Sequence, residues 1–461
     1  MTTENSNTSA GQPEPIRCGN LLISFTSEFH RVWDSRGSGA AVGSFWRPAP
    51  APDLLPGYFP LGDLAVTGYD NVNGNRIVAV VCEGETSNDG ASQGKALSPP
   101  MDYERVWRDS NSGAAADCTV WRPLPPAGYV ALGFVCSNGR DKPLLNAIRC
   151  VRKDLVIPAS VSDLIWDDKG SGARQNFSAW NIDPPQAAAG EIYFSPGTFF
   201  GAQSHSRPET SNAYALRMQM PRQTLPAPVT PKLSGYGAPP EPEPAGVTQT
   251  VRIPWFAVSD HLLPEEQWRT SAFYRLERSD QYVLAGYGHN TSQRPRPFKW
   301  RALRTQNSQT LQVFSILTSI EVATAWPPKP SNGARAIRFS AHLHKDFTYT
   351  ETSSRGWEDA RPLDIVAMAA KNKAVAIYQI QSFYTLKRAD GTPVGISIGY
   401  TDDESLYLTE YPPETDSTLT FTPQLATEPF ASQGPADNEN EDVDTASQPM
   451  REEIRVTDSA P

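Results

Sequence analysis

The chain has 461 residues, of which 39% are hydrophobic and 20% charged, so two or three domains with buried cores are expected. Its 42 prolines and 32 glycines favour short strands and turns over long helices. Nine acidic residues and two arginines after residue 426 contribute most of the net charge of −10. The remainder is nearly neutral, so no binding to nucleic acid is expected.

The N-terminal residues give the first indication of location. Residues 1–15 are polar, are predicted to be disordered, and lack the basic head and apolar core of a secretory signal. No apolar run is long enough for a transmembrane helix. The five cysteines are unevenly spaced without a CxxC pair, which favours reduced thiols. We therefore expect a cytoplasmic or peripheral-membrane protein, with export by a non-classical route left open.

Residues 16–220 contain one sequence motif three times: a Trp, an acidic residue, a Gly/Ser-rich corner and a second Trp. The first tryptophans are Trp33, Trp107 and Trp166, and the second follow 13, 14 and 14 residues later at Trp46, Trp121 and Trp180. A repeated unit of this kind cannot bury its apolar face alone, so the copies are expected to pack around a common centre. The pattern predicts a three-repeat, β-prism-like N-terminal domain in an all-β protein.

The rest of the chain is predicted to hold a second domain behind a linker. Residues 221–246 contain eight prolines and are expected to form an extended linker. Residues 247–425 are predicted to form a mainly-β, sandwich-like domain, and residues 426–461 a disordered acidic tail. Strands are expected at 251–258 and 310–317, a helix at 363–372, and a hairpin of 374–386 and 394–400 around the Asp390-Gly391 turn.

The phrases of the first half resemble a known family. Trp33 to Ala40, Trp46-Arg47-Pro48, Gly57-Tyr58 and Leu61-Gly62 recur as Trp107 to Ala114, Trp121-Arg122-Pro123, Gly128-Tyr129 and Leu132-Gly133. Together they resemble the Vps62 family over about residues 16–220. The resemblance implies a β-prism-like, non-catalytic module linked to vacuolar protein sorting and membrane association. Similar modules also occur in bacterial proteins that look like secreted or insecticidal toxins.

The repeated aromatic and acidic residues are the first candidates for contact with a ligand or membrane. They are Trp33, Asp34, Trp107, Asp109, Trp166 and Asp167. Exposed tryptophans could stack on a sugar or enter a lipid interface, whereas buried ones would pin each copy to the core. The acids, with Asp168, could bind calcium or cap their turns. No D-x-D-x-D-G spacing is present, so no metal is predicted.

A second candidate lies in the other half. The segment from Arg294 to Arg301 interleaves cations with aromatic residues, and Arg294, Arg296, Lys299 and Trp300 could contact anionic lipid headgroups. The alternative is a solvated loop that leads into a strand.

Evidence for catalysis is weak. None of the common nucleophile, phosphate-binding or zinc-protease motifs is present. His342, His344 and Asp346 share a strand face and are the only site considered for an enzyme in residues 247–425. We therefore expect a non-catalytic protein without cofactors that binds a membrane surface or glycan, with a protein partner left open. The alternatives are a toxin component, since residues 310–320 partly alternate, and an enzyme.

Overall fold

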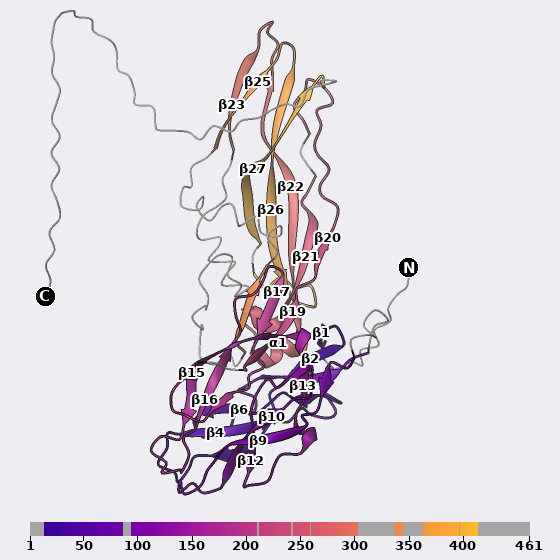
Figure 1. The fold of residues 1–461 in the computed structure, drawn as a ribbon. Coiled ribbons are helices and arrows are strands. Elements are labelled where there is room, and N and C mark those ends of the chain that lie inside the picture. The colour runs from indigo at the N-terminus through magenta and orange to yellow at the C-terminus, as the bar shows by residue number, and fades with distance from the viewer. Residues whose placement is uncertain are drawn as a thin grey trace, which may run out of the picture.

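The structure, a computed structural model, describes residues 13–85, 94–209, 212–240, 243–258, 260–302, 337–343, 363–395 and 397–413. Almost all of its regular structure is β, as predicted, and the molecule is elongated (Figure 1). Residues up to about 220 lie at one end, and long strands of the second half extend to the other end. No helix within these ranges is long and apolar enough to span a membrane.

Each Trp-containing copy forms an antiparallel sheet of three strands. The sheets are β3 (Phe29–Asp34), β4 (Gly43–Pro48) and β6 (Leu64–Thr67); β9 (Asp102–Arg108), β10 (Cys118–Leu124) and β12 (Val135–Asn138); and β15 (Ser160–Asp167), β16 (Ser178–Asp183) and β18 (Phe200–Ala202). In every sheet the first Trp lies on the first strand and the second Trp on the next strand. A shift in register beside the first or the second Trp accompanies this arrangement each time.

Three further sheets cover this group. Their strands, in order of pairing, are β1 (Ile16–Cys18), β2 (Leu21–Thr26), β7 (Val78–Glu83) and β5 (Phe59–Pro60); β11 (Tyr129–Val130), β13 (Cys150–Arg152) and β8 (Leu97–Ser98); and β14 (Val156–Pro158), β19 (Tyr214–Gln219), β17 (Glu191–Phe194) and β24 (Phe339–His342). Short 3-10 turns lie at Leu145–Ala147 and Lys153–Leu155. Strand β24 comes from the second half of the chain, so the two halves share a sheet.

The second half is built on one long antiparallel sheet. Its strands, in spatial order, are β20 (Arg222–Thr224), β21 (Gly246–Pro254), β22 (Phe273–His289), β26 (Ala374–Lys387) and β27 (Ile398–Tyr411). A pair of strands, β23 (Arg296–Ala302) and β25 (Leu363–Ala369), lies at the far end of this sheet (Figure 1). The 3-10 turn Trp255–Ala257 and helix α1 (Pro264–Thr270) lie near the first half.

Several local predictions can now be compared with the structure. The hairpin around Asp390-Gly391 is confirmed, since β26 pairs with β27 and Lys387 bridges to Pro393. The helix predicted at 363–372 is wrong, because residues 363–369 form β25. The strand predicted at 251–258 ends at Pro254, where the 3-10 turn begins. The strand predicted at 310–317 and the whole of the acidic tail predicted at 426–461 lie outside the described residues.

The proline-rich segment is closely packed against the long sheet. We name residues 225–240 and 243–246 the proline strap. At one end the Leu225 N–H donates to the Thr248 carbonyl at 2.8 Å, and further along Leu233 is buried against the tyrosine-rich side of the sheet. Tyr236 stacks on His289 with ring centres 4.7 Å apart. The segment predicted as a linker therefore covers one side of the sheet.

Candidate functional site

The first tryptophans of the three copies meet at one centre. The rings of Trp33, Trp107 and Trp166 contact one another edge to face, with centroids 5.5 to 6.0 Å apart. Each residue is at most 4% exposed, and aromatic pairs of this geometry stabilise a core. The interpretation of these residues as buried pins is therefore correct. A surface contact through them is wrong, because they have almost no exposed surface.

Hydrogen bonds link the three copies in a closed cycle around this centre. Each first Trp donates its indole N–H to a backbone carbonyl in another copy: Trp33 to Ala116 at 2.7 Å, Trp107 to Gln175 at 3.0 Å and Trp166 to Ala41 at 2.7 Å. The acceptors lie eight or nine residues after the first Trp of their own copies. A buried indole N–H needs such an acceptor. The Trp residues thus join the copies as well as filling the space between them.

The Gly/Ser corners approach one another at one end of this group. A Cβ on Gly39 would lie 2.3 Å from the Gly170 carbonyl oxygen, and one on Gly37 would lie 2.8 Å from that of Gly113. Only glycine fits at such distances. In the corners the serine of each Gly-Ser or Asn-Ser step accepts a hydrogen bond from the amide two residues later, as Ser112 does from Ala114 at 3.0 Å. The corners are therefore close-packed and leave no room between these glycines for a ligand.

Two of the predicted acids cap their own turns. Asp34 accepts from the Arg36 amide at 3.2 Å and lies 3.4 Å from Arg31. Asp167 accepts from the Lys169 amide at 3.3 Å. Both follow the alternative given for repeated Asp residues, which is local turn capping. Within the described ranges, no group of three or more potential ligands could hold a metal ion.

The second residue after the first Trp is buried in every copy but differs between copies: it is Ser35, Asp109 or Asp168. Asp168 accepts from the Trp107 indole at 2.9 Å, from the Phe177 amide at 2.8 Å, and contacts His205 Nε2 at 2.6 Å. Asp109 is equally buried, but its Oδ1 has no hydrogen-bond partner. Burial raises the pKa of Asp109, although a hydrogen bond from Ser112 opposes this effect. Nothing in the repeat spacing indicated the His205 contact, because His205 lies outside the repeated phrase.

The remaining predicted residues lie on or beside strand β23. Its inner face is apolar: Phe298 and Trp300 stack on each other and lie over Gly288 and Gly286 of β22. Any Cβ on Gly286 would lie 2.2 Å from the Trp300 ring, so the glycines provide the space for the aromatics. Trp300 is therefore half-buried, and only part of its ring is available for the predicted contact with lipid headgroups.

The opposite face of β23 and β25 points to solvent, and we name it the basic outer face. Directly paired residues share a face of a sheet, so Lys299 lies beside Val366 and Pro297 beside Met368. Val366 and Met368 are 43% and 61% exposed. Arg301 also lies on this face, where it pairs with Asp364 at 3.2 Å.

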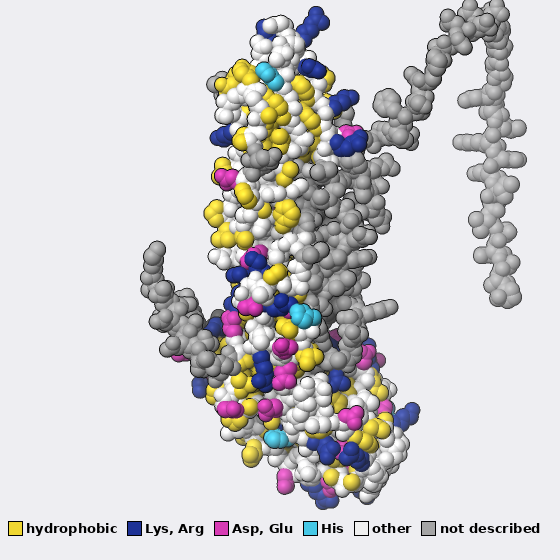
Figure 2. Space-filling model, turned by 180° about the vertical axis from the view of Figure 1, so that it is seen from behind, with side chains coloured by type: hydrophobic (Ala, Val, Ile, Leu, Met, Phe, Trp, Pro, Cys, Tyr) yellow, Lys and Arg dark blue, Asp and Glu magenta, His cyan; other side chains and the backbone are white. Residues whose placement is uncertain are grey.

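More cations surround this face. Arg294 is exposed in the loop before β23, and Arg296 is exposed with its guanidinium 5.4 Å from the centre of the Phe298 ring. Lys371 is exposed in the turn after β25. Figure 2 shows Lys and Arg side chains gathered around this end of the molecule, next to hydrophobic ones. Arg296 thus lies on the Phe298 side of β23 and Lys299 on the outer face, so the structure places the predicted cations on or just before one strand but on different faces of it, far from the acids of the repeats.

The site considered for an enzyme is only partly described. His342 ends β24 and pairs with Glu191 of β17 in the shared sheet. His344 and Asp346 lie outside the described residues, so no contact among the three is known. Burial alone would raise the pKa of the Glu191 carboxyl, but hydrogen bonds from Arg217 and Tyr193 outweigh it and lower the pKa.

The first half of the chain matches a known family. Residues 4–228 match the family described as Vps62, vacuolar protein sorting-associated protein 62, which confirms the resemblance found in the repeats. No curated protein matches the chain.

Two solved structures show partial similarity. GNIP1Aa from Chromobacterium piscinae is 24% identical with a TM-score of 0.35, over 43% of this chain. This chain spans only 37% of the length of GNIP1Aa. Cry35Ab1 is 10% identical with a TM-score of 0.30, over 69% of this chain and 89% of its own length.

Proposed function

Given that residues 4–228 match the Vps62 family, we propose that this protein is a non-catalytic module that binds an anionic membrane surface through the basic outer face. The observation that carries the proposal is the pairing of exposed cations with exposed apolar side chains on β23 and β25. Met368 and Val366 can enter the headgroup region while Lys299 on the same face, and Arg296 at the start of β23, remain at the level of the lipid phosphates. Neighbouring apolar side chains beside cations are the composition that a membrane-contacting face needs.

The magnitude of the attraction follows from the charges. Arg294, Arg296, Lys299 and Lys371 are exposed around the face, and each cation near an anionic surface contributes about 1 kcal/mol. Arg301 contributes less, because Asp364 neutralises it. Four such cations together would give about 4 kcal/mol at moderate salt, to which apolar insertion adds. Binding should weaken steeply as salt concentration rises.

Co-sedimentation with vesicles tests this proposal. Wild-type protein should bind vesicles that contain 30% phosphatidylserine, and the double variant Arg296→Glu/Lys299→Glu should bind at least about a hundredfold more weakly. The matched control is Lys169→Glu/Arg174→Glu, which changes the same charge on an exposed corner of the first half. Equal loss in both variants, or no dependence on either, would contradict the proposal.

A leakage assay on the same vesicles separates the alternatives that the sequence left open. Binding without release of a trapped dye supports a surface-binding module. Release of the dye would favour a toxin component. Retention on glycan-coated beads with no vesicle binding would favour the glycan alternative and refute the membrane proposal.

A further inference from the structure

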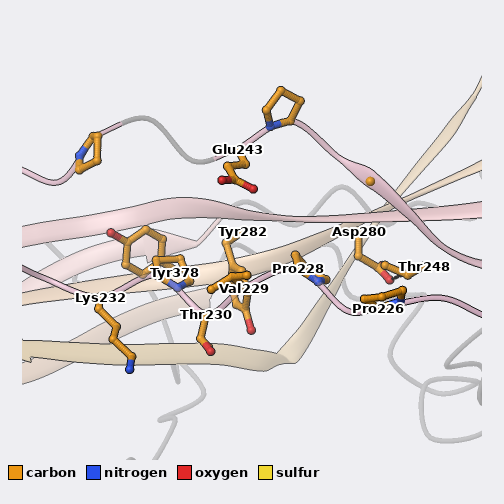
Figure 3. A pocket seen from close by; sticks show the side chains of 14 residues that line it. Pro226, Pro228, Val229, Thr230, Lys232, Glu243, Thr248, Asp280, Tyr282 and Tyr378 are labelled. Atoms are coloured by element: carbon orange, nitrogen blue, oxygen red, sulfur yellow. Dashed lines mark hydrogen bonds between the residues drawn. The ribbon is translucent and has the colours of Figure 1, made fainter.

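A cavity of about 380 Å³ lies between the proline strap and the long sheet (Figure 3). Its walls are two limbs of the strap, which supply five prolines between Pro226 and Pro244. Thr248, Asp280, Tyr282 and Tyr378 of the sheet form its floor. Proline fixes its own backbone torsion, the first limb is anchored at Leu225 and Leu233, and the second limb runs directly into β21 at Gly246, so the cavity is preformed. A preformed cavity of this volume suits a small ligand.

The aromatic part of the floor is centred on Tyr282. Its ring is half-buried and contacts Tyr378 edge to face, with centroids 6.4 Å apart. Tyr378 is nearly fully buried, so it holds Tyr282 in place from below. The face of a tyrosine ring carries negative electrostatic potential, which attracts cations.

The charged groups of the cavity are unequal in what they offer a ligand. Glu243 extends from the strap toward the side on which Tyr282 lies, whereas the ammonium of Lys232 points away from both (Figure 3). Asp280 is already used by the protein: it accepts from Arg278 at 2.9 Å, from Ser382 at 2.5 Å and from the Thr248 hydroxyl. Glu243 is therefore the charge that a ligand in the cavity would meet.

We propose that this cavity binds a quaternary ammonium group of the choline type. Such a cation is bulky and weakly hydrated, and it cannot donate hydrogen bonds, so proline and tyrosine surfaces suit its methyl groups. The Tyr282 ring face and the Glu243 carboxylate both favour its positive charge. An anion would be repelled by Glu243. A neutral sugar would need several hydrogen-bonding groups, and the floor offers few, because Asp280 and Thr248 bind each other.

The test compares choline with its neutral isostere, 3,3-dimethylbutan-1-ol, on the unmodified full-length protein by ligand-observed NMR titration. Choline should bind with a dissociation constant of about a millimolar, as expected for so small a ligand. The isostere has the same shape without the charge, and it should bind roughly tenfold more weakly. Equal binding of the two, or no saturable binding of choline, overturns the proposal without relying on any variant.

Single-residue variants then test which side chains bind the choline group. Tyr282→Leu should weaken choline binding about tenfold, whereas Tyr282→Phe keeps the ring face and should remain within about twofold of wild type. Glu243→Gln should weaken it several-fold, and Lys232→Gln is the control at the rim that should have no such effect. Each variant is compared by its thermal unfolding midpoint. Unchanged affinity in a folded Tyr282→Leu protein would contradict the assignment.

The choline group could come from a free metabolite or from a lipid headgroup. Vesicles of phosphatidylcholine, compared with vesicles in which phosphatidylethanolamine replaces it, distinguish the two sources. Stronger binding to phosphatidylcholine that Tyr282→Leu abolishes identifies a headgroup site, while binding of free choline alone identifies a soluble ligand. This site does not depend on the basic outer face: Arg296→Glu/Lys299→Glu should leave choline affinity unchanged, so each proposal can fail without the other.

Discussion

Replacing each of the three central tryptophans with phenylalanine tests how the copies are joined. Every such change deletes one indole N–H and its part-buried hydrogen bond to a backbone carbonyl, which costs about 0.5–1.5 kcal/mol. Trp107 differs, because its N–H also donates to Asp168 Oδ2 at 2.9 Å. A hydrogen bond to a charged group contributes about 1.5–3 kcal/mol. Trp107→Phe should therefore destabilise the protein by about 2 kcal/mol more than Trp33→Phe or Trp166→Phe.

Urea unfolding followed by far-ultraviolet circular dichroism measures this difference, since the same substitution at three matched sites cancels the loss of ring volume. A double-mutant cycle with Asp168→Asn isolates the pair, and a coupling energy of about 1.5–3 kcal/mol is expected. Destabilisation that is equal at all three sites, within about 0.5 kcal/mol, would refute the view that the Asp168 carboxylate depends on the Trp107 indole.

Two further stability predictions follow from close contacts. Gly39→Ala should cost about 1–3 kcal/mol, because its Cβ would meet the Gly170 carbonyl, whereas Gly235→Ala has nothing within 4 Å and should be nearly neutral; similar melting temperatures would contradict this. Asp260 is buried, which alone would raise its pKa, but hydrogen bonds from Arg388, Tyr274 and the His261 amide lower the pKa to about 2. A lowered folded-state pKa contributes stability that is present above pH ~4 and lost as the pH falls toward 2, so Asp260→Asn should flatten the pH dependence of unfolding in that window by about 2 kcal/mol.

The repeat could be found in the sequence because its geometry depends on residue types with few substitutes. Indole rings and close glycine contacts recur at fixed spacing, so Trp33, Trp107 and Trp166 predicted a shared centre. The spacing could not show which copy supplies each hydrogen bond. Nor could it show the contact between Asp168 and His205, since Asp168 follows β15, His205 follows β18, and the two strands are brought near each other by their common partner β16.

The second half was harder to predict because local composition and tertiary environment disagree. Residues 363–369 are rich in Ala, Met and Leu, which favour helix, and this led to the wrong helix prediction. In the structure Ile365, Ala367 and Ala369 are buried while Val366 and Met368 are exposed, which is the alternation of a strand. Similarly, Gly286 and Gly288 two residues apart in a strand indicated close packing, and that signal could have placed Phe298 and Trp300 inside.

Strand β24 has a consequence for how this protein can be rearranged by recombination. Residues 339–342 pair with β17 of the family-matching half, Ser340 accepts from the Ala187 amide at 2.8 Å, and Arg338 forms an ion pair with Asp183 at 2.7 Å. A gene fragment that ended at the proline strap would leave the β17 edge bare and ready to pair with other chains. We therefore expect the first half to need a replacement strand at the β17 edge when it is expressed alone or fused to another protein.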